Sequence, residues 1–326
     1  MSELKQRKIE ANGIRMHIAE QGDGPLVIMC HGFPESWYSW RHQLSALAQA
    51  GFHAVAPDMR GYGQTDRPDA IDQYSLLHLI GDMVGLVDAL GAETAVIVGH
   101  DWGAPVAWHA AQLRPDRFRG VIGLSVPFLP RGQVHPSEKL PETDDAVFYQ
   151  QYFQEPGVAE ADLERDVHFS VRSILCGYAG DAIPLEAIKA GVGSIGLVPR
   201  KGGMLAGSVN PSSLPSWLTE ADIEFYVREF ARTGYRGGLN WYRNIARNWQ
   251  LLSPFEGAKV VVPALYIVGD RDLVLAFRGM EQLISGLSND VPKLQPTVTL
   301  SGCGHWTQQE RPQDVNKAMI DFLRRL

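Results

Sequence analysis

Short apolar runs alternate with amphipathic segments through the first third of the chain. Three apolar runs, each followed by turn residues, stand at residues 26–30, 54–56 and 95–98. Continuous runs of this length are typical of strands buried on both faces of a parallel sheet. Residues 76–87 instead have apolar side chains at helical spacing, with Ser75 and Gly91 suited to the two ends of a helix. The pattern predicts an α/β fold with a mostly parallel, doubly wound sheet.

This alternation stops near residue 128. From about residue 129 to 250 the chain lacks strand-like runs and has helical stretches rich in aromatic residues. The strand and helix patterns resume at residues 260–268, 297–300 and 313–325. We therefore expect a core formed by residues 1–128 and 251–326, with a helical lid (cap) domain of residues 129–250 inserted between its two parts.

Composition and charge narrow the choice of partners. The 326 residues are 45% hydrophobic and 21% charged, as in ordinary globular proteins. A formal net charge of -7 provides no basic surface for nucleic acid or an anionic membrane. No apolar run approaches the roughly 20 residues that span a bilayer, and the first residues contain no apolar core of a secretory signal. We expect a cytoplasmic protein that binds small molecules, without nucleic-acid binding or membrane insertion.

The cysteines and glycines predict neither disulfides nor a cofactor. The three cysteines are an odd number with wide spacing, so no disulfide framework is implied. Cys303 lies close to His305, but no second Cys/His cluster stands at ligand spacing, so we expect no metal. Residues 191–196 spell Gly-x-Gly-x-x-Gly, which binds dinucleotides only between a strand and a helix. Helical residues precede this motif and Pro199 follows it, so we interpret it as a flexible connection in the lid and expect no cofactor.

The strongest chemical signal is Gly99-His100-Asp101-Trp102-Gly103, where a buried strand turns into a helix. Small residues two places before and after the centre let the strand and helix approach closely, which pushes the central side chain out above the sheet. This pattern is a nucleophile elbow with aspartate where serine is usual. An N-capping aspartate at an ordinary turn is the alternative, and the candidate partners elsewhere in the chain favour the nucleophile.

Partners for the nucleophile follow the other predicted strands. His305 comes just after the last strand and is the candidate base, while either Asp270 or Asp272 could be the acid that faces it. The chain order nucleophile, acid, histidine occurs in one of the known triad lineages. An oxyanion hole needs two backbone N–H donors. We expect them from Trp102, directly after the nucleophile, and from Phe33, in the turn after the first buried strand.

A carboxylate nucleophile restricts the reaction. It attacks a saturated carbon with a strained or good leaving group, which gives an alkyl ester of Asp101. His305 then activates a water that attacks the ester carbonyl, and the oxyanion hole stabilises the tetrahedral intermediate. The leaving group is either a halide, which needs N–H donors, or an epoxide oxygen, which needs an acid. Tyrosine can be that acid, because its phenol stays protonated at neutral pH.

Five motifs resemble those of the soluble epoxide hydrolases of the α/β-hydrolase fold, over nearly the whole chain. They are His-Gly-Phe-Pro-Glu at 31–35, Gly-His-Asp-Trp-Gly at 99–103, Gly-His-Trp-Thr-Gln at 304–308, and the lid stretches 149–157 and 239–244. The resemblance implies that Tyr149 and Tyr242 bind and protonate the epoxide oxygen, with Tyr152, one helical turn on, as the fallback for the first. Aromatic stripes also serve packing alone, and the aspartate nucleophile favours catalysis here.

The same resemblance places the acid at Asp272 rather than Asp270, and it implies that Glu35 and His100 help to hold the hydrolytic water. We therefore expect an epoxide hydrolase that converts epoxides and water to vicinal diols. The aromatic, apolar lid indicates a lipophilic substrate, since ligand pockets are mostly apolar with a few polar anchors. The sequence does not decide whether the protein forms a homodimer.

Two alternatives remain at this point. A haloalkane dehalogenase would share the aspartate nucleophile and Trp102, although that related family commonly has asparagine at the position of Phe33. A non-catalytic receptor would keep the ligand pocket without turnover. The presence of a nucleophile, a base, an acid and N–H donors makes the receptor the weaker of the two.

Overall fold

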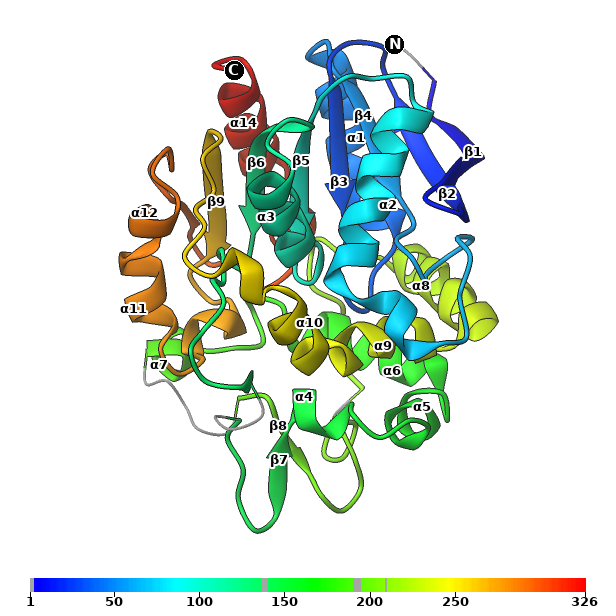
Figure 1. Cartoon of the computed structure of the whole chain (residues 1–326). Coiled ribbons are helices and arrows are strands. Elements are labelled where there is room, and N and C mark those ends of the chain that lie inside the picture. The colour runs from blue at the N-terminus through cyan, green and yellow to red at the C-terminus, as the bar shows by residue number, and fades with distance from the viewer. Residues whose placement is uncertain (1–2, 137–139, 190–194, 209) are drawn as a thin grey trace.

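The computed structural model describes residues 3–136, 140–189, 195–208 and 210–326, and within them the chain forms one eight-stranded sheet. The strands are β1 (Lys5–Ala11), β2 (Ile14–Gln21), β3 (Leu26–Cys30), β4 (His53–Pro57), β5 (Ala95–His100), β6 (Phe118–Leu124), β9 (Ala264–Gly269) and β10 (Val298–Leu300). Their order is β1-β2-β4-β3-β5-β6-β9-β10 (Figure 1). β2 runs antiparallel to both β1 and β4, and the other pairs are parallel. The predicted mostly parallel sheet is confirmed.

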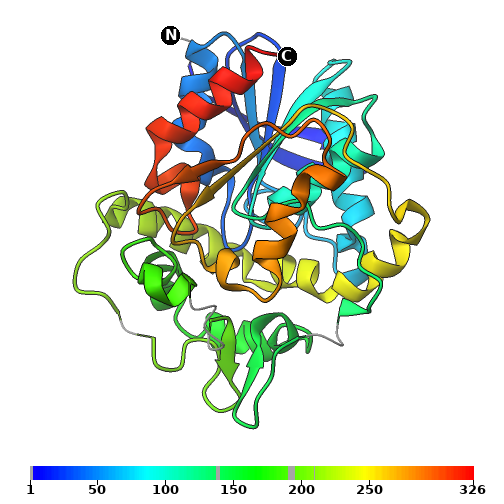
Figure 2. The ribbon, with the colours of Figure 1, turned by 90° about the vertical axis from the view of Figure 1, so that its left-hand side faces the viewer.

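Helices cover both faces of the sheet, because alternate side chains of each buried strand point to opposite faces. Val27 and Met29 of β3 pack in one core cluster with α1 (Arg41–Gln49) and α14 (Pro312–Leu323). Ile28 and Cys30 pack in the other cluster with α2 (Leu76–Ala89) and α3 (Gly103–Leu113). Figure 2 shows α14 in red beside α1 in blue, on one side of the sheet. This three-layer arrangement leaves the carboxyl ends of the parallel strands open at one edge.

The segment between β6 and β9 lies against that edge of the sheet (Figure 1). It contains β7 (Ala146–Phe148), α4 (Tyr149–Tyr152), α5 (Val158–Leu163), α6 (Val167–Gly177), α7 (Leu185–Lys189), β8 (Leu197–Pro199), α8 (Glu220–Thr233), α9 (Arg236–Arg243) and α10 (Ile245–Leu251). β7 and β8 pair in an antiparallel ribbon that was not predicted, because three-residue strands are too short for an apolar-run signal.

The division into a core and a cap of residues 129–250 stays a prediction. Residues 190–194, with most of the glycine-rich motif, lie outside the described residues.

The remaining elements connect the core strands. They are the 3-10 helices η1 (Trp37–Trp40), η2 (Ile71–Tyr74), η4 (Ser253–Phe255) and η5 (Leu273–Ala276), and the helices α11 (Met280–Ser285), α12 (Leu287–Asp290) and α13 (Thr307–Glu310). In the part of the chain that the structure describes, no helix is both long enough and apolar enough to cross a bilayer. The cytoplasmic location and the homodimer stay predictions.

Candidate active site

Asp101 occupies the sharp turn between β5 and α3. Its φ of 49° is positive, a conformation that non-glycine residues rarely adopt outside strained, functional turns. Glycine is required on both sides of it: a Cβ on Gly99 would lie 1.9 Å from the carbonyl oxygen of Gly103, and a Cβ on Gly103 would lie 2.1 Å from that of Cys30. The close approach of strand, helix and neighbouring strand pushes the carboxylate outward, where the N–H of Phe33 donates to its Oδ1 at 2.7 Å.

Asp272 and His305 come to Asp101 from the ends of β9 and β10, which lie beyond β6 in the sheet. Asp272 follows β9 and His305 follows β10, and the carboxyl ends of parallel strands meet at one edge of the sheet. Nδ1 of His305 lies 3.0 Å from Oδ1 of Asp272, and Nε2 lies 3.5 Å from Oδ2 of Asp101. Asp270 points elsewhere, because its Oδ1 accepts the N–H of Gly302 at 2.8 Å. The structure therefore brings Asp272, not Asp270, to the histidine.

The two carboxylates control the charge of His305. Burial lowers the pKa of His305, but the charge of Asp272 and the hydrogen bonds with Asp101 and Asp272 outweigh burial and raise this pKa well above its ordinary value. Burial likewise raises the pKa of Asp272, but the charge of His305 and the hydrogen bonds from His305, Val274 and Ser125 together outweigh burial and lower this pKa. Both carboxylates therefore favour the protonated form of the imidazole that lies between them.

Tyr149 and Tyr242 face the same cavity as Asp101 and His305. The cavity is narrow, with a volume of about 50 Å³. Its lining is mostly apolar and consists of Phe33, Pro34, Asp101, Tyr149, Phe153, Ile174, Tyr178, Gly196, Met204, Tyr242, Leu273, Val274, Phe277, His305 and Trp306. The rings of Tyr149, from α4, and Tyr242, from α9, have centroids 5.8 Å apart. Burial, followed by the charge of Asp101, raises the pKa of both phenols, so both are protonated at neutral pH.

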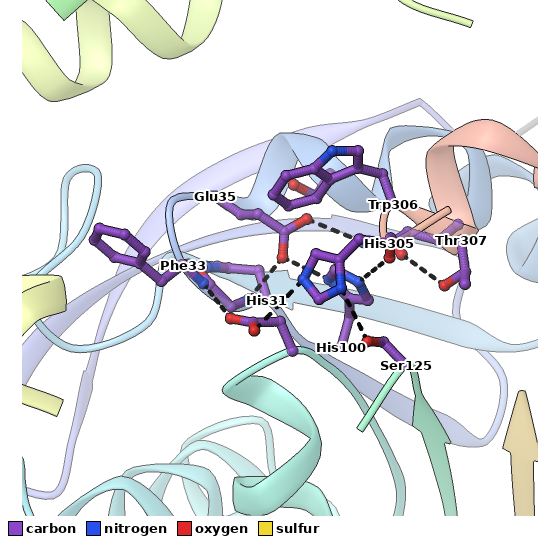
Figure 3. A network of polar contacts seen from close by, with 12 residues as sticks. His31, Phe33, Glu35, His100, Ser125, His305, Trp306 and Thr307 are labelled. Atoms are coloured by element: carbon purple, nitrogen blue, oxygen red, sulfur yellow. Dashed lines mark hydrogen bonds and ion pairs between the residues drawn. The ribbon is translucent and has the colours of Figure 1, made fainter. Parts of the chain in front are cut away.

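Glu35 and His100 form a buried ion pair beneath the site (Figure 3). Nδ1 of His100 lies 2.7 Å from Oε2 of Glu35, and Nε2 lies 2.7 Å from the carbonyl oxygen of His305, to which it must donate. Oε2 of Glu35 also accepts the N–H of Gly32 at 2.8 Å, and its Oε1 accepts Nε2 of Gln308 at 3.1 Å. Burial raises the pKa of Glu35, but the charge and hydrogen bond of His100, followed by the charge of His31 and the N–H of Gly32, outweigh burial and bring this pKa to about 2. The pair therefore joins the Gly32 turn to the His305 turn, and its expected contact with water stays a prediction.

Comparison with known proteins identifies the family of the chain. Residues 25–173 match the family model of the alpha/beta hydrolase fold. Epoxide hydrolase A of Mycobacterium tuberculosis (strain ATCC 25618 / H37Rv) is 43% identical over 98% of this chain and 97% of its own length. The chain belongs to the epoxide hydrolases of the α/β-hydrolase fold. Epoxide hydrolase 3 of Siraitia grosvenorii is 42% identical over 99% of each chain. An epoxide hydrolase from an endophytic Streptomyces superposes with a TM-score of 0.93 at 44% identity, over 98% of this chain and 95% of that one.

The remaining predicted residues of this epoxide hydrolase are Tyr152, Trp102 and Phe33. Tyr152, the fallback proton donor, lies outside the cavity lining and donates its hydroxyl to Oδ2 of Asp162 at 3.1 Å. Trp102 is the N-cap residue of α3, and its ring centroid lies 5.2 Å from that of Tyr242. The N–H of Phe33 already contacts the Asp101 carboxylate, whereas the matching role of the Trp102 N–H stays a prediction.

Ser125 and Tyr178 lie at the site and were missed by the sequence analysis. Oγ of Ser125, just after β6, lies 3.0 Å from Nδ1 of His305, and Oη of Tyr266 donates to the carbonyl oxygen of Ser125 at 2.7 Å. Ser125 follows the apolar residues of β6, a strand that the sequence analysis did not predict, and this apolar run was a usable signal. Tyr178 places a third phenol in the cavity lining, with its ring centroid 6.4 Å from that of His305. It follows α6 without any motif, so nothing in the sequence marked it.

Proposed function

We propose that this epoxide hydrolase opens lipophilic epoxides to vicinal diols through an alkyl ester on Asp101. The observation that carries the proposal is that the Asp101 carboxylate shares one mostly apolar cavity with two protonated phenols, Tyr149 and Tyr242. The names of the similar proteins, which are epoxide hydrolases over nearly their whole length, support the reaction class. An apolar lining supports a lipophilic substrate.

Ester formation uses the two oxygens of Asp101 differently. Oδ1 accepts the N–H of Phe33, so Oδ2 is the oxygen available to attack an epoxide carbon. As the new C–O bond forms, the epoxide C–O bond breaks and its oxygen takes a proton from Tyr149 or Tyr242. A phenol is suited to this task because it is protonated at neutral pH and still more acidic than the alcohol that it creates.

Ester hydrolysis follows from the change in charge at Asp101. Alkylation removes one of the two negative charges that raise the pKa of His305, so this pKa falls and the imidazole gives up its proton to restore the phenol. Neutral His305, oriented by Asp272, then takes one proton from a water that attacks the ester carbon of Asp101. The N–H of Phe33 stabilises the oxyanion. Collapse of this intermediate releases the diol, whose new hydroxyl takes the second proton of the water.

We also propose that residues 129–250 form a helical cap whose role is to bring the phenols to the core. Tyr149 and Tyr242 come from α4 and α9 in this segment, whereas Asp101, Asp272 and His305 follow strands of the sheet. Two phenols opposite Asp101 favour an epoxide, whose departing oxygen needs a proton, over a halide, which leaves as a stable anion.

A single turnover in water labelled with ¹⁸O tests the ester mechanism. The water attacks Asp101 rather than the substrate, so excess enzyme should place the first label in the Asp101 carboxylate and leave the first diol unlabelled. Repeated turnover is the matched control, in which label passes from Asp101 into the diol. Label found directly in the diol of the first turnover would exclude the ester.

A further inference from the structure

A buried carboxylate outside the triad organises the turn that carries His305. Glu310, the last residue of α13, is 7% exposed. Its Oε2 accepts the N–H of Gly304 at 2.9 Å, and its Oε1 accepts the N–H of Trp306 at 3.1 Å. Gly304 and Trp306 are the two neighbours of His305, and Figure 3 shows Trp306 and Thr307 continuing directly from the histidine. Glu310 thus holds the backbone on both sides of the candidate base.

The same carboxylate joins this turn to the segment between β6 and β9. Oε2 of Glu310 also accepts the N–H of Gly180 at 3.0 Å. The backbones of Gly304 and Gly180 are in close contact, because a Cβ on Gly304 would lie 2.4 Å from the nitrogen of Gly180. The N–H of His305 itself donates to the carbonyl oxygen of Tyr178 at 3.0 Å. The turn with the base therefore rests on residues 178–180, and Glu310 is the side chain that links the two.

We propose that Glu310 is a positioning residue for ester hydrolysis, which aims Nε2 of His305 at the attacking water. The proposal rests on the proposed function. A carboxylate accepts hydrogen bonds at both oxygens, so it can hold the N–H groups of Gly304 and Trp306 at once. Glutamine has only one accepting oxygen. Its NH₂ group would therefore face the N–H of either Gly304 or Trp306, and that hydrogen bond would be lost. A shift of about 1 Å in a catalytic group can cost about a hundredfold in rate.

The nucleophile is held by a separate set of contacts, which lets the two steps be tested apart. Asp101 is fixed by Gly99, Gly103 and the N–H of Phe33. The carboxylate of Glu310 instead accepts the N–H groups of Gly180, Gly304 and Trp306. Loss of Glu310 should therefore disturb the base and leave the attack of Asp101 on the epoxide nearly intact. A purely structural role would lower stability and slow both steps together.

Glu310→Gln in the full chain is the direct test. Rapid-mixing measurements with a styrene-type epoxide should separate ester formation from ester hydrolysis. We expect formation within about threefold of wild type and hydrolysis slower by about tenfold to a hundredfold, so that the ester accumulates. Glu310→Asp, which keeps the charge on a shorter side chain, should give an intermediate rate of hydrolysis. It carries the test if Glu310→Gln does not fold.

Asp162→Asn is the matched control. Asp162 is 8% exposed and likewise accepts backbone N–H groups, from Met204 at 2.7 Å and Leu205 at 3.4 Å, but it does not contact the His305 turn. This control should lower the melting temperature without slowing hydrolysis relative to formation. Equal slowing of both steps in the Glu310 variants, or no slowing, would overturn the positioning role. Absence of any ester even in His305→Gln would instead contradict the proposed mechanism.

Discussion

The two sides of the cavity are held in place by different physics. On the sheet side, backbone contacts leave no free space: a Cβ on Gly99 would lie 1.9 Å from the carbonyl oxygen of Gly103, and a Cβ on Gly103 would lie 2.1 Å from that of Cys30. On the side of the segment between β6 and β9, Tyr242 is held by aromatic neighbours, with ring centroids 4.9 Å from Phe153 and 5.8 Å from Tyr149. Backbone contact fixes one side, and side-chain packing fixes the other.

This difference matches the demands of the two kinds of chemistry. A nucleophile must meet the reacting carbon, and a base must meet the attacking water, within a fraction of an ångström, which favours groups set on strand ends. A phenol that donates a proton can follow the departing oxygen by side-chain rotation. The division implies that changes on the sheet side stop the covalent cycle, whereas changes on the other side slow one step of it.

The largest expected effect is that of Asp101→Ala. Without the carboxylate no ester can form, and we expect turnover to fall by at least about 10⁴-fold. The elbow geometry depends on Gly99 and Gly103, so the variant should still fold. Diol formation and a thermal melt measure the two properties. Turnover within about a hundredfold of wild type would contradict the role of Asp101 as nucleophile.

His305→Gln should separate the two covalent steps. Asp101 can still attack the epoxide, but no base activates the water, so we expect a burst of one equivalent of ester followed by turnover slower by about 10² to 10⁴-fold. Mass spectrometry of the protein after mixing should detect the adduct on Asp101. A variant that neither turns over nor forms the adduct would contradict the proposed mechanism, in which His305 acts only after the ester has formed.

Tyr149→Phe and Tyr242→Phe test the other side of the cavity. Each change removes one proton donor and keeps the ring that packs there, so we expect ester formation to slow by about tenfold to a hundredfold in each variant and more in the double variant. Ester hydrolysis should change little. Tyr152→Phe is the control, because its hydroxyl contacts Asp162 outside the cavity lining. A loss in Tyr152→Phe as large as in Tyr149→Phe would contradict the assignment.

The difference between the two sides of the cavity also determines which site residues could be predicted from the sequence. The elbow is local: glycines at 99 and 103 around Asp101, after an apolar run, suffice to place the carboxylate above the sheet. The choice of the acid that faces His305 depends less on local sequence. Asp270 and Asp272 stand two residues apart after one strand, and only the course of the turn, in which Asp270 accepts the N–H of Gly302, separates them. Resemblance to the family, rather than spacing, favoured Asp272.

Residues beyond the sheet are harder to predict because tertiary packing decides them. Tyr149 and Tyr152 stand at opposite ends of the four-residue α4, and the sequence alone cannot tell which hydroxyl enters the cavity. Tyr178 reaches the cavity from the chain after α6, where no motif marks it. The ribbon of β7 and β8 joins residues about fifty apart through three pairs, too few for a periodic signal.

The smallest expected effect concerns the ion pair of Glu35 and His100 on the sheet side. Burial alone would raise the pKa of Glu35, but His100, with smaller contributions from His31 and the N–H of Gly32, brings it from an ordinary 4.5 to about 2. A carboxyl group whose pKa is lower in the folded state stabilises the fold above its ordinary pKa, and this contribution is lost as the pH falls toward the folded value. The stability that Glu35 contributes should thus be complete above about pH 4.5 and disappear toward pH 2.

Glu35→Gln should make this dependence visible. We expect the free energy of unfolding to fall by on the order of 1–3 kcal/mol at neutral pH, because a buried hydrogen-bonded charge is lost, and the difference from wild type to shrink between pH 4.5 and about 2. Urea unfolding over a series of pH values measures it. The exposed ion pair of Lys317 and Asp321 supplies the control, Asp321→Asn, which should change stability little at any pH. A difference between wild type and Glu35→Gln that stays constant down to pH 2 would mean that Glu35 acts through packing, and that its charge does not help to join the two turns beneath the nucleophile.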